Sequence, residues 1–187
     1  MEGLRERKLA ASRARVVDVA FDLFAERGFD AVTVVEVCAA ADIAPRTFFR
    51  YFPTKDDLLA EPARVMADRM RTALREVPPE LPDAAALRGA VLALGEAVVA
   101  DADRTARLFR VVRSSAAARP HPFLRLTERE RELAELLVAR SGRSEVDWRT
   151  RLLVARATAA FRVWLDDLVD GVGGDPVQHL AEVLDLR

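Results

Sequence analysis

The chain has 187 residues, of which 51% are hydrophobic and 32% are charged, and its formal net charge is −1. This hydrophobic fraction excludes an intrinsically disordered chain, and the small net charge argues against a protein that coats nucleic acid non-specifically. No apolar run reaches the roughly 20 residues of a membrane span, the basic start lacks an apolar signal core, and a single cysteine cannot form an internal disulfide, so we expect a cytoplasmic protein without membrane contact.

An all-helical fold is favoured, because Ala, Leu, Arg, Val, Glu and Asp dominate and alternating β-branched or aromatic residues are scarce. The first helix is predicted from Leu4 to Arg27, where apolar residues keep helical spacing, and Gly28 is expected to end it. Arg7 and Lys8 belong to a basic cluster near its start. That cluster is either an arm that follows a phosphate backbone or an ordinary solvated helix end.

The stretch from residue 33 to residue 55 predicts two short helices joined by a tight turn. Thr33 and Glu36 form a capping-box pattern for the first helix. Asp42 falls at the turn, where it tolerates a left-handed backbone. Pro45 suits the first turn of the second helix, which covers residues 46–52 and must end before Pro53.

The second of these helices has two different faces. Phe48 and Phe52 are four residues apart and are expected to anchor it. The other face is predicted to present side chains suited to phosphates, sugars and base edges: Arg46, Thr47, Phe49, Arg50 and Tyr51. Between Ala44 and Lys55 there is no acidic residue. The pattern indicates a DNA-binding helix–turn–helix, although two solvated helices of a bundle would also fit it.

The block FAERGFDAVTVVEVCAAADIAPRTFFRYFPTKDDLL resembles the DNA-binding domain of TetR-family repressors. The shared features are a Gly-aromatic helix end, a Thr that opens the next helix, and an aromatic-rich helix closed by an aromatic-Pro-x-Lys motif. Asp42 replaces the family's usual turn Gly, and Ala44 replaces its usual capping Ser. The TFFRYFP variant is also similar to actinobacterial members, including regulators found with mycofactocin genes. The resemblance implies that DNA is contacted by Thr33, Pro45, Arg46, Thr47, Phe49, Arg50, Tyr51 and Lys55.

A connecting helix is predicted from Thr54 to Val77, with Pro62 inside it as a point of kinking. We place the domain boundary at its start, which gives a DNA-binding domain at residues 1–55 and a second domain at residues 56–187. Further helices are expected at residues 83–100 with Asp83 as the cap, 101–117, 123–140, 144–170 and 175–186, with a loop at 118–122. The whole chain should then hold about nine helices.

Nothing in the sequence supports an enzyme, a cofactor or a metal site. His121 and His179 are far apart in sequence, and no Cys–His spacing typical of a metal site occurs. Phosphate-binding glycine loops and nucleophile motifs are also missing. We therefore expect a binding protein.

For the second domain, the resemblance implies an effector pocket between helices. The sequence offers a soft apolar lining, each member of which could equally be plain core: Met66, Met70, Leu94, Phe109, Phe123, Leu137 and Trp148. Arg156 either extends to solvent or meets an anionic group of the ligand. We favour the solvent-directed orientation. The expected effector is a small hydrophobic molecule.

The last two predicted helices carry broad apolar stripes. The residues expected at an association surface are Phe161, Trp164, Leu165, Leu168, Val177, Leu180 and Leu184. In the family, these helices pair across a two-fold axis, which implies a homodimer. The alternative is a hairpin buried within one subunit, and both can be partly true.

Taken together, the residues and the resemblance predict a ligand-responsive, dimeric DNA-binding repressor, released from operator DNA by a small, largely apolar molecule. The alternative is a helical binding or scaffold protein that keeps the fold without reading an operator. The basic, acid-free helical stretch from Ala44 to Lys55 favours the first function.

Overall fold

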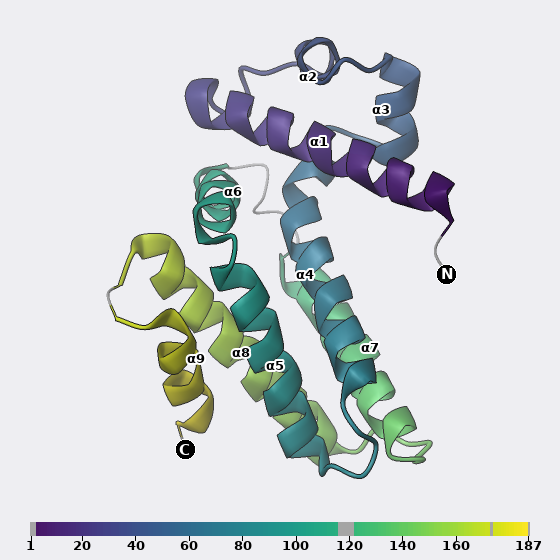
Figure 1. The fold of residues 1–187 in the computed structure, drawn as a ribbon, viewed down its shortest axis with the longest axis vertical. Helices are drawn as coiled ribbons and strands as arrows, with labels where there is room; N and C mark the ends of the chain where they lie inside the picture. Colours follow the sequence, from purple (N-terminus) through teal and green to yellow (C-terminus); the bar gives the residue numbers. More distant parts are fainter. Residues whose placement is uncertain (1–2, 116–121, 173, 187) are drawn as a thin grey trace. The chain divides into compact units, whose positions relative to one another are not determined.

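The computed structural model describes residues 3–115, 122–172 and 174–186, with only the backbone described at residues 4–6 and 122–126. Over these residues the chain forms nine α-helices and no strand, which confirms the predicted fold class (Figure 1). Most of the loop predicted at 118–122 lies outside the described residues. The helices are α1 (Leu4–Arg27), α2 (Val34–Ala41), α3 (Pro45–Tyr51), α4 (Asp56–Glu76), α5 (Asp83–Val99), α6 (Ala102–Ser114), α7 (Pro122–Arg140), α8 (Trp148–Asp170) and α9 (Pro176–Asp185).

Most helix ends lie where local sequence signals predicted them. Gly28 (φ 82°) follows α1 and Asp42 (φ 54°) follows α2, both in the left-handed region. Asp175 caps α9 by accepting hydrogen bonds from backbone N–H groups of its first turn. The prediction that Asp83 caps α5 is wrong. Asp83 lies inside the first turn of α5, and its carboxylate pairs with Arg143 instead.

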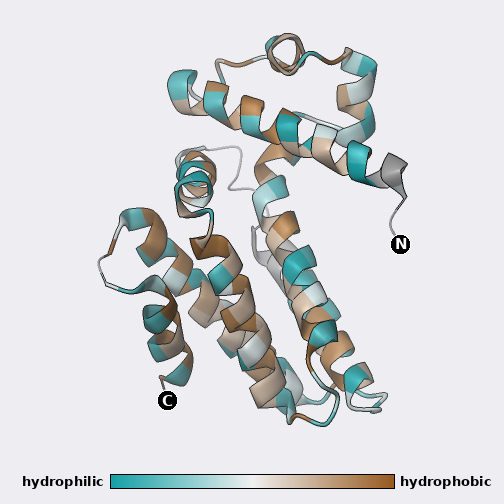
Figure 2. Ribbon diagram, in the orientation of Figure 1, coloured by the Kyte–Doolittle hydropathy of each residue, from teal (hydrophilic) through white to brown (hydrophobic). Residues whose placement is uncertain are grey.

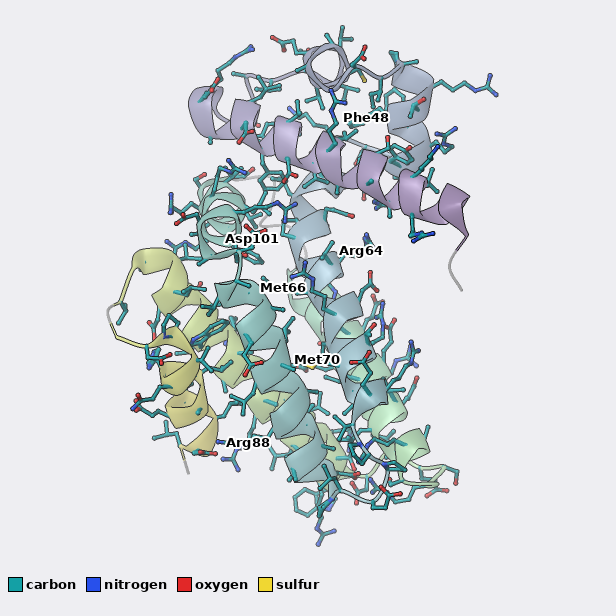
Figure 3. The ribbon with its side chains drawn as sticks, viewed as in Figure 1. Phe48, Arg64, Met66, Met70, Arg88 and Asp101 are labelled. Carbon is teal, nitrogen blue, oxygen red and sulfur yellow. The ribbon has the colours of Figure 1, made fainter. Side chains whose placement is uncertain are left out.

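The chain folds into two compact units. The first comprises Met1–Pro62 and Arg107–Pro120, and the second comprises Ala63–Ala106 and His121–Arg187. In the first unit, the inward faces of α1, α2 and α3 enclose an aromatic and aliphatic core, in which Phe48 is surrounded by these helices (Figure 3). Aromatic rings pack edge to face inside it, with the centroids of Phe24 and Phe29 separated by 5.0 Å. This core fixes the relative positions of α2 and α3.

The second half of α6 belongs to the first unit. Leu108 and Val111 are buried in the same core as α1, α2 and α3. An ion pair of 2.9 Å between Arg107 and Asp22 joins α6 to α1. The sequence-based boundary between residues 55 and 56 did not include this segment. The domain limits drawn from the sequence stay a prediction, since compact units and domains need not coincide.

In the second unit, α5 is apolar along most of its length and packs against α8 and α9 (Figures 1 and 2). Its buried face carries Leu87, Val91, Leu94 and Val98. Gly95 lets α9 approach closely, because a Cβ atom there would lie 2.2 Å from the Cδ2 atom of Leu180. The second unit is thus built around α5.

Candidate functional site

The N-terminus of α2 is held by a complete capping box. The hydroxyl of Thr33 accepts a hydrogen bond from the backbone N–H of Glu36, and the Glu36 carboxylate accepts from the backbone N–H of Thr33 (2.8 Å). The same carboxylate pairs with Arg27 at 2.7 Å. These hydrogen bonds, chiefly the one from the Thr33 backbone, lower the pKa of Glu36 to about 2. The Thr33 hydroxyl, predicted to contact phosphate, is therefore already engaged in the cap.

The turn between α2 and α3 sets the direction of α3. Asp42 adopts the left-handed conformation, and the N–H of Ile43 donates to the carbonyl of Cys38 at 3.0 Å. Ala44 is the N-cap of α3 and gives no side-chain hydrogen bond, as expected from its methyl group. Its carbonyl oxygen instead accepts from the N–H groups of Thr47 and Phe48, at 2.8 Å and 3.2 Å.

The inward face of α3 is anchored as the sequence predicted. Phe48 and Phe52 are fully buried, with ring centroids 5.4 Å apart. The prediction that Tyr51 shares the outward face is wrong, because Tyr51 is only 7% exposed. A hydrogen bond with Ser12 is the main cause of its lowered pKa. A DNA contact from Tyr51 stays a prediction.

The outward face of α3 is basic and aromatic. Arg46, Arg50 and Pro45 are exposed, and Thr47 is half-buried. Phe49 is 53% exposed, and its ring stands edge to face on that of Phe48, with 5.4 Å between the centroids. This face presents two guanidinium groups and one supported aromatic ring, which suit phosphates and base edges.

Lys55 lies directly before α4 and is half-buried. Its Nζ atom donates to the carbonyl oxygens of Phe29 (2.9 Å) and Val32 (3.0 Å) and lies 4.1 Å from the centroid of the Phe29 ring. An ammonium group has three N–H donors, so one remains for a phosphate. Lys55 therefore fixes the α1–α2 loop in addition to its predicted phosphate contact.

Two features of the first unit escaped the sequence analysis. Arg13 on α1 makes a bidentate ion pair with the buried Glu61 on α4, with both N···O distances at 2.8 Å, and its guanidinium lies over the ring of Phe52. Val35 on α2 is a large, exposed apolar side chain. The only sequence signal for the ion pair was an acidic residue between apolar neighbours on α4.

The residues predicted to line an effector pocket do not gather in one place. Phe109 packs against the core of the first unit, and Trp148 is exposed at the start of α8. Arg156 is exposed and donates to the carbonyl oxygen of Leu186 at 3.0 Å, the solvent-directed orientation. The side chain of Phe123 lies outside the described residues. The remaining members, all in the second unit, are the buried Met70, Leu94 and Leu137 and the half-buried Met66.

A cavity of about 450 Å³ lies between α4 and α5, within the second unit. It shares only Leu94 with the predicted set. Four polar or charged residues of α4 line it, together with apolar residues of both helices: Val65, Asp68, Arg69, Thr72, Ala73, Glu76, Ala93, Leu94 and Ala97. Its volume falls within the range usual for small-molecule sites. Its lining combines these charged side chains with a mainly apolar surface, and the predicted set of pocket residues stays a prediction.

The apolar stripes of α8 and α9 are only partly open. Trp164, Leu165 and Leu180 are buried inside the subunit, and the Nε1–H of Trp164 donates to the carbonyl of Pro176 at 2.7 Å. Their predicted place on an exposed surface is wrong. The other predicted interface residues are half-buried: Phe161, Leu168, Val177 and Leu184. The exposed apolar residues of α8 include Leu152 and Val163, 52% and 48% exposed.

Within the described part of the chain, no group of three or more His, Cys, Asp or Glu residues is placed to hold a metal ion. None of the helices described there is long and apolar enough to cross a membrane. Cys38 is a buried thiol whose pKa is raised by that burial.

Residues 16–61 match the family model described as bacterial regulatory proteins, tetR family. The chain is 30% identical over 168 residues to the HTH-type transcriptional regulator TcmR of Streptomyces glaucescens, covering 86% of this chain and 74% of TcmR. It is 25% identical over 165 residues to MftR of Mycobacterium tuberculosis, named for transcriptional regulation of mycofactocin biosynthesis, covering 86% of this chain and 83% of MftR.

The crystal structure of NalD, the secondary repressor of the MexAB-OprM multidrug efflux pump in Pseudomonas aeruginosa, has the same fold. The TM-score is 0.60 at 17% identity, over 95% of each chain. Combined with the helix–turn–helix at α2 and α3, these similarities define a DNA-binding transcriptional regulator of a non-enzymatic class. The chain belongs to the TetR family.

Proposed function

We propose that this regulator is a dimeric repressor that leaves its operator when a small molecule binds its second unit. The observation that carries the DNA-binding part is the outward face of α3. Arg46, Phe49 and Arg50 are exposed there, and Phe48 and Phe52 hold the helix from behind. A short, rigidly anchored, basic helix fits the major groove. A cytoplasmic location goes with this proposal, because bacterial operator DNA lies in the cytoplasm.

The roles on α3 follow from side-chain chemistry. Arg46 and Phe49 are proposed to reach base edges, the first through guanidinium hydrogen bonds and the second by apolar contact with thymine methyl groups. Thr47 and Pro45 are proposed to border the same groove. Arg50 is proposed to bind a backbone phosphate. The remaining predicted contacts, from Thr33, Tyr51 and Lys55, would also be to phosphates.

The switch is proposed to act through α4. This helix runs from the first unit into the second, and the division between the units comes directly after Pro62. Because Pro62 lacks a backbone N–H, α4 misses one hydrogen bond there and bends at lower cost. A ligand in the α4–α5 cavity would favour one direction of α4 over another. Ligand and DNA would then oppose each other by the same coupling free energy, typically about 1–3 kcal/mol.

A homodimer is proposed because an operator with two half-sites needs two helix–turn–helix units. The second unit offers an open surface on α8. Leu152, Ala159 and Val163 are exposed there at helical spacing. Together with the half-buried Val177 and Leu184 of α9, they form the proposed α8–α9 contact surface.

The test is DNA binding by variants of α3, measured by fluorescence anisotropy on genomic fragments selected with the wild-type protein. Arg46→Ala should lower discrimination between base pairs by about 1–3 kcal/mol at particular operator positions, because it removes a base contact. Arg50→Ala should weaken binding to all sequences alike and reduce the salt slope by about one, because it removes a phosphate contact.

Arg131→Ala is the matched control. Arg131 is an exposed arginine of α7 whose surface pair with Glu135 contributes little. It should bind DNA as the wild type does. Unchanged affinity and specificity in both α3 variants would rule out the proposed DNA-binding face.

A further inference from the structure

Two charged side chains that line the α4–α5 cavity have no partner within the part of the chain that the structure describes. Asp68 is neutralised by ion pairs with Arg64 (2.5 Å) and Arg71. Arg69 and Glu76, in contrast, form no hydrogen bond or ion pair among the described residues. Both are exposed side chains that line the cavity. The cavity therefore carries one open positive group and one open negative group.

The two groups are separated along α4. They are seven residues apart, which places them on the same face of the helix with a rise of about 10 Å between them. The residues between them on this face are Thr72 and Ala73, and α5 contributes Ala93, Leu94 and Ala97. The space between the charges is thus bordered mainly by small apolar groups, which favour a slim apolar body.

The C-terminus of α4 adds to the negative electrostatic potential near Glu76. Glu76 is the last residue of α4, so it lies beside backbone carbonyl groups that have no partner within the helix. These carbonyls carry the negative end of the helix dipole. A cationic group is therefore favoured at this end, and an anionic group is favoured at Arg69.

We propose that the α4–α5 cavity binds an elongated zwitterion or similar amphiphile, in which an apolar body about 10 Å long joins an anionic end at Arg69 to a cationic end at Glu76. This inference rests on the proposed function, since it names the chemical class of the effector. It adds a charged group at each end to the largely apolar effector expected from the sequence.

The test is a set of four probes with the same eight-carbon body: 8-aminooctanoic acid, octanoic acid, octylamine and 1-octanol. Binding to the full-length protein is measured by isothermal titration calorimetry. The wild type should bind 8-aminooctanoic acid several-fold to about tenfold more tightly than either singly charged probe, because both ends are matched. It should bind 1-octanol most weakly.

Two variants test the anionic and the cationic end of the probe separately. In Arg69→Ala, 8-aminooctanoic acid should bind no better than octylamine, because the carboxylate has lost its partner. In Glu76→Gln, it should bind no better than octanoic acid, because the amino group has lost its partner. The matched controls Arg75→Ala and Glu80→Gln remove exposed charges that do not line the cavity, and they should keep the wild-type order.

The inference is overturned if the wild type binds none of the probes or all of them equally, or if both cavity variants keep the wild-type order. DNA binding without any probe is measured in parallel and should be unchanged in Arg69→Ala and Glu76→Gln. Normal DNA binding with no probe preference would reject the zwitterion alone. Loss of wild-type DNA binding would reject the proposed function, whatever the probes do.

Discussion

At the residue scale, the carboxylate of Glu36 holds the first residues of the helix–turn–helix in place. Glu36 accepts hydrogen bonds from both the backbone N–H and the hydroxyl of Thr33, at 2.8 Å and 2.7 Å, and pairs with Arg27 on α1. A carboxylate also suits the positive end of the α2 dipole. The first turn of α2, from which DNA contacts are proposed, is thereby joined to the end of α1.

This arrangement predicts a dependence of stability on pH. Because the pKa of Glu36 is lowered from 4.5 to about 2 in the folded chain, its stabilising effect is complete above pH 4.5. That effect should be lost as the pH falls from 4.5 to about 2, where the folded chain also takes up the proton. Glu36→Gln should therefore be less stable than the wild type at pH 7, and the two should converge near pH 2. Urea unfolding at a series of pH values measures the difference, and a constant gap across that range would contradict the prediction.

At the element scale, the two glycines of α5 lie on different faces of the helix, one packed against α9 and the other exposed. Gly95 faces α9, and a methyl group added there would meet the buried side chain of Leu180, itself packed near Trp164. Gly89 lies on the exposed face of the same helix, with nothing within 4 Å of an added Cβ atom. Glycine lowers the helix propensity at both positions alike, so only tertiary packing distinguishes the two positions.

Replacing each of these two glycines by alanine is expected to change the stability of the protein in opposite directions. Gly95→Ala should lower the free energy of unfolding by about 1–3 kcal/mol, because it overpacks a filled interface. Gly89→Ala should raise it by about 0.5–1 kcal/mol, because alanine loses less conformational entropy in a helix. Chemical unfolding of both variants checks this. Stabilisation by both would show that α9 does not pack closely on α5.

At the scale of the whole molecule, we expect different roles for the buried and the exposed apolar residues of α8. Trp164 is buried and hydrogen-bonded to the carbonyl of Pro176 on α9, so it holds the subunit together. Val163, its neighbour in sequence, is exposed together with Leu152 on the proposed α8–α9 contact surface. We therefore expect Trp164 to act in folding and the adjacent Val163 to act in the proposed association.

Sedimentation at micromolar concentration should give a mass of twice 20.7 kDa for the wild type. Val163→Asp should sediment as a folded monomer, because it places a charge in the proposed interface. Trp164→Asp should instead lose helical content or melt at a lower temperature, because it buries a charge in the core. A monomeric wild type would refute the proposed dimer, and a dimeric Val163→Asp would refute this position for its interface.

The sequence by itself determined the features that depend on a few neighbouring residues. The capping box at Thr33, the left-handed turn at Asp42 and the glycine stop at Gly28 follow from local backbone chemistry, and all three occur in the structure. The anchoring of α3 by Phe48 and Phe52 follows from four-residue spacing, and both are buried. The resemblance to the TetR family rests on the same block of sequence, and the relatives of this chain confirm it.

Only the tertiary structure decided what depends on distant partners. In the sequence, Trp164 and Leu165 belong to an apolar stripe that could face another subunit or could pack inside its own. Only their burial in the structure distinguishes these two possibilities. Tyr51 lies inward because Ser12 and α1 are close to it, although it is 39 positions from Ser12 (51 − 12). The cavity lined by Arg69 and Glu76 is formed by residues of both α4 and α5, so it depends on how these two helices pack. Periodicity shows that a helix has faces, but which face is covered depends on packing between segments far apart in the chain.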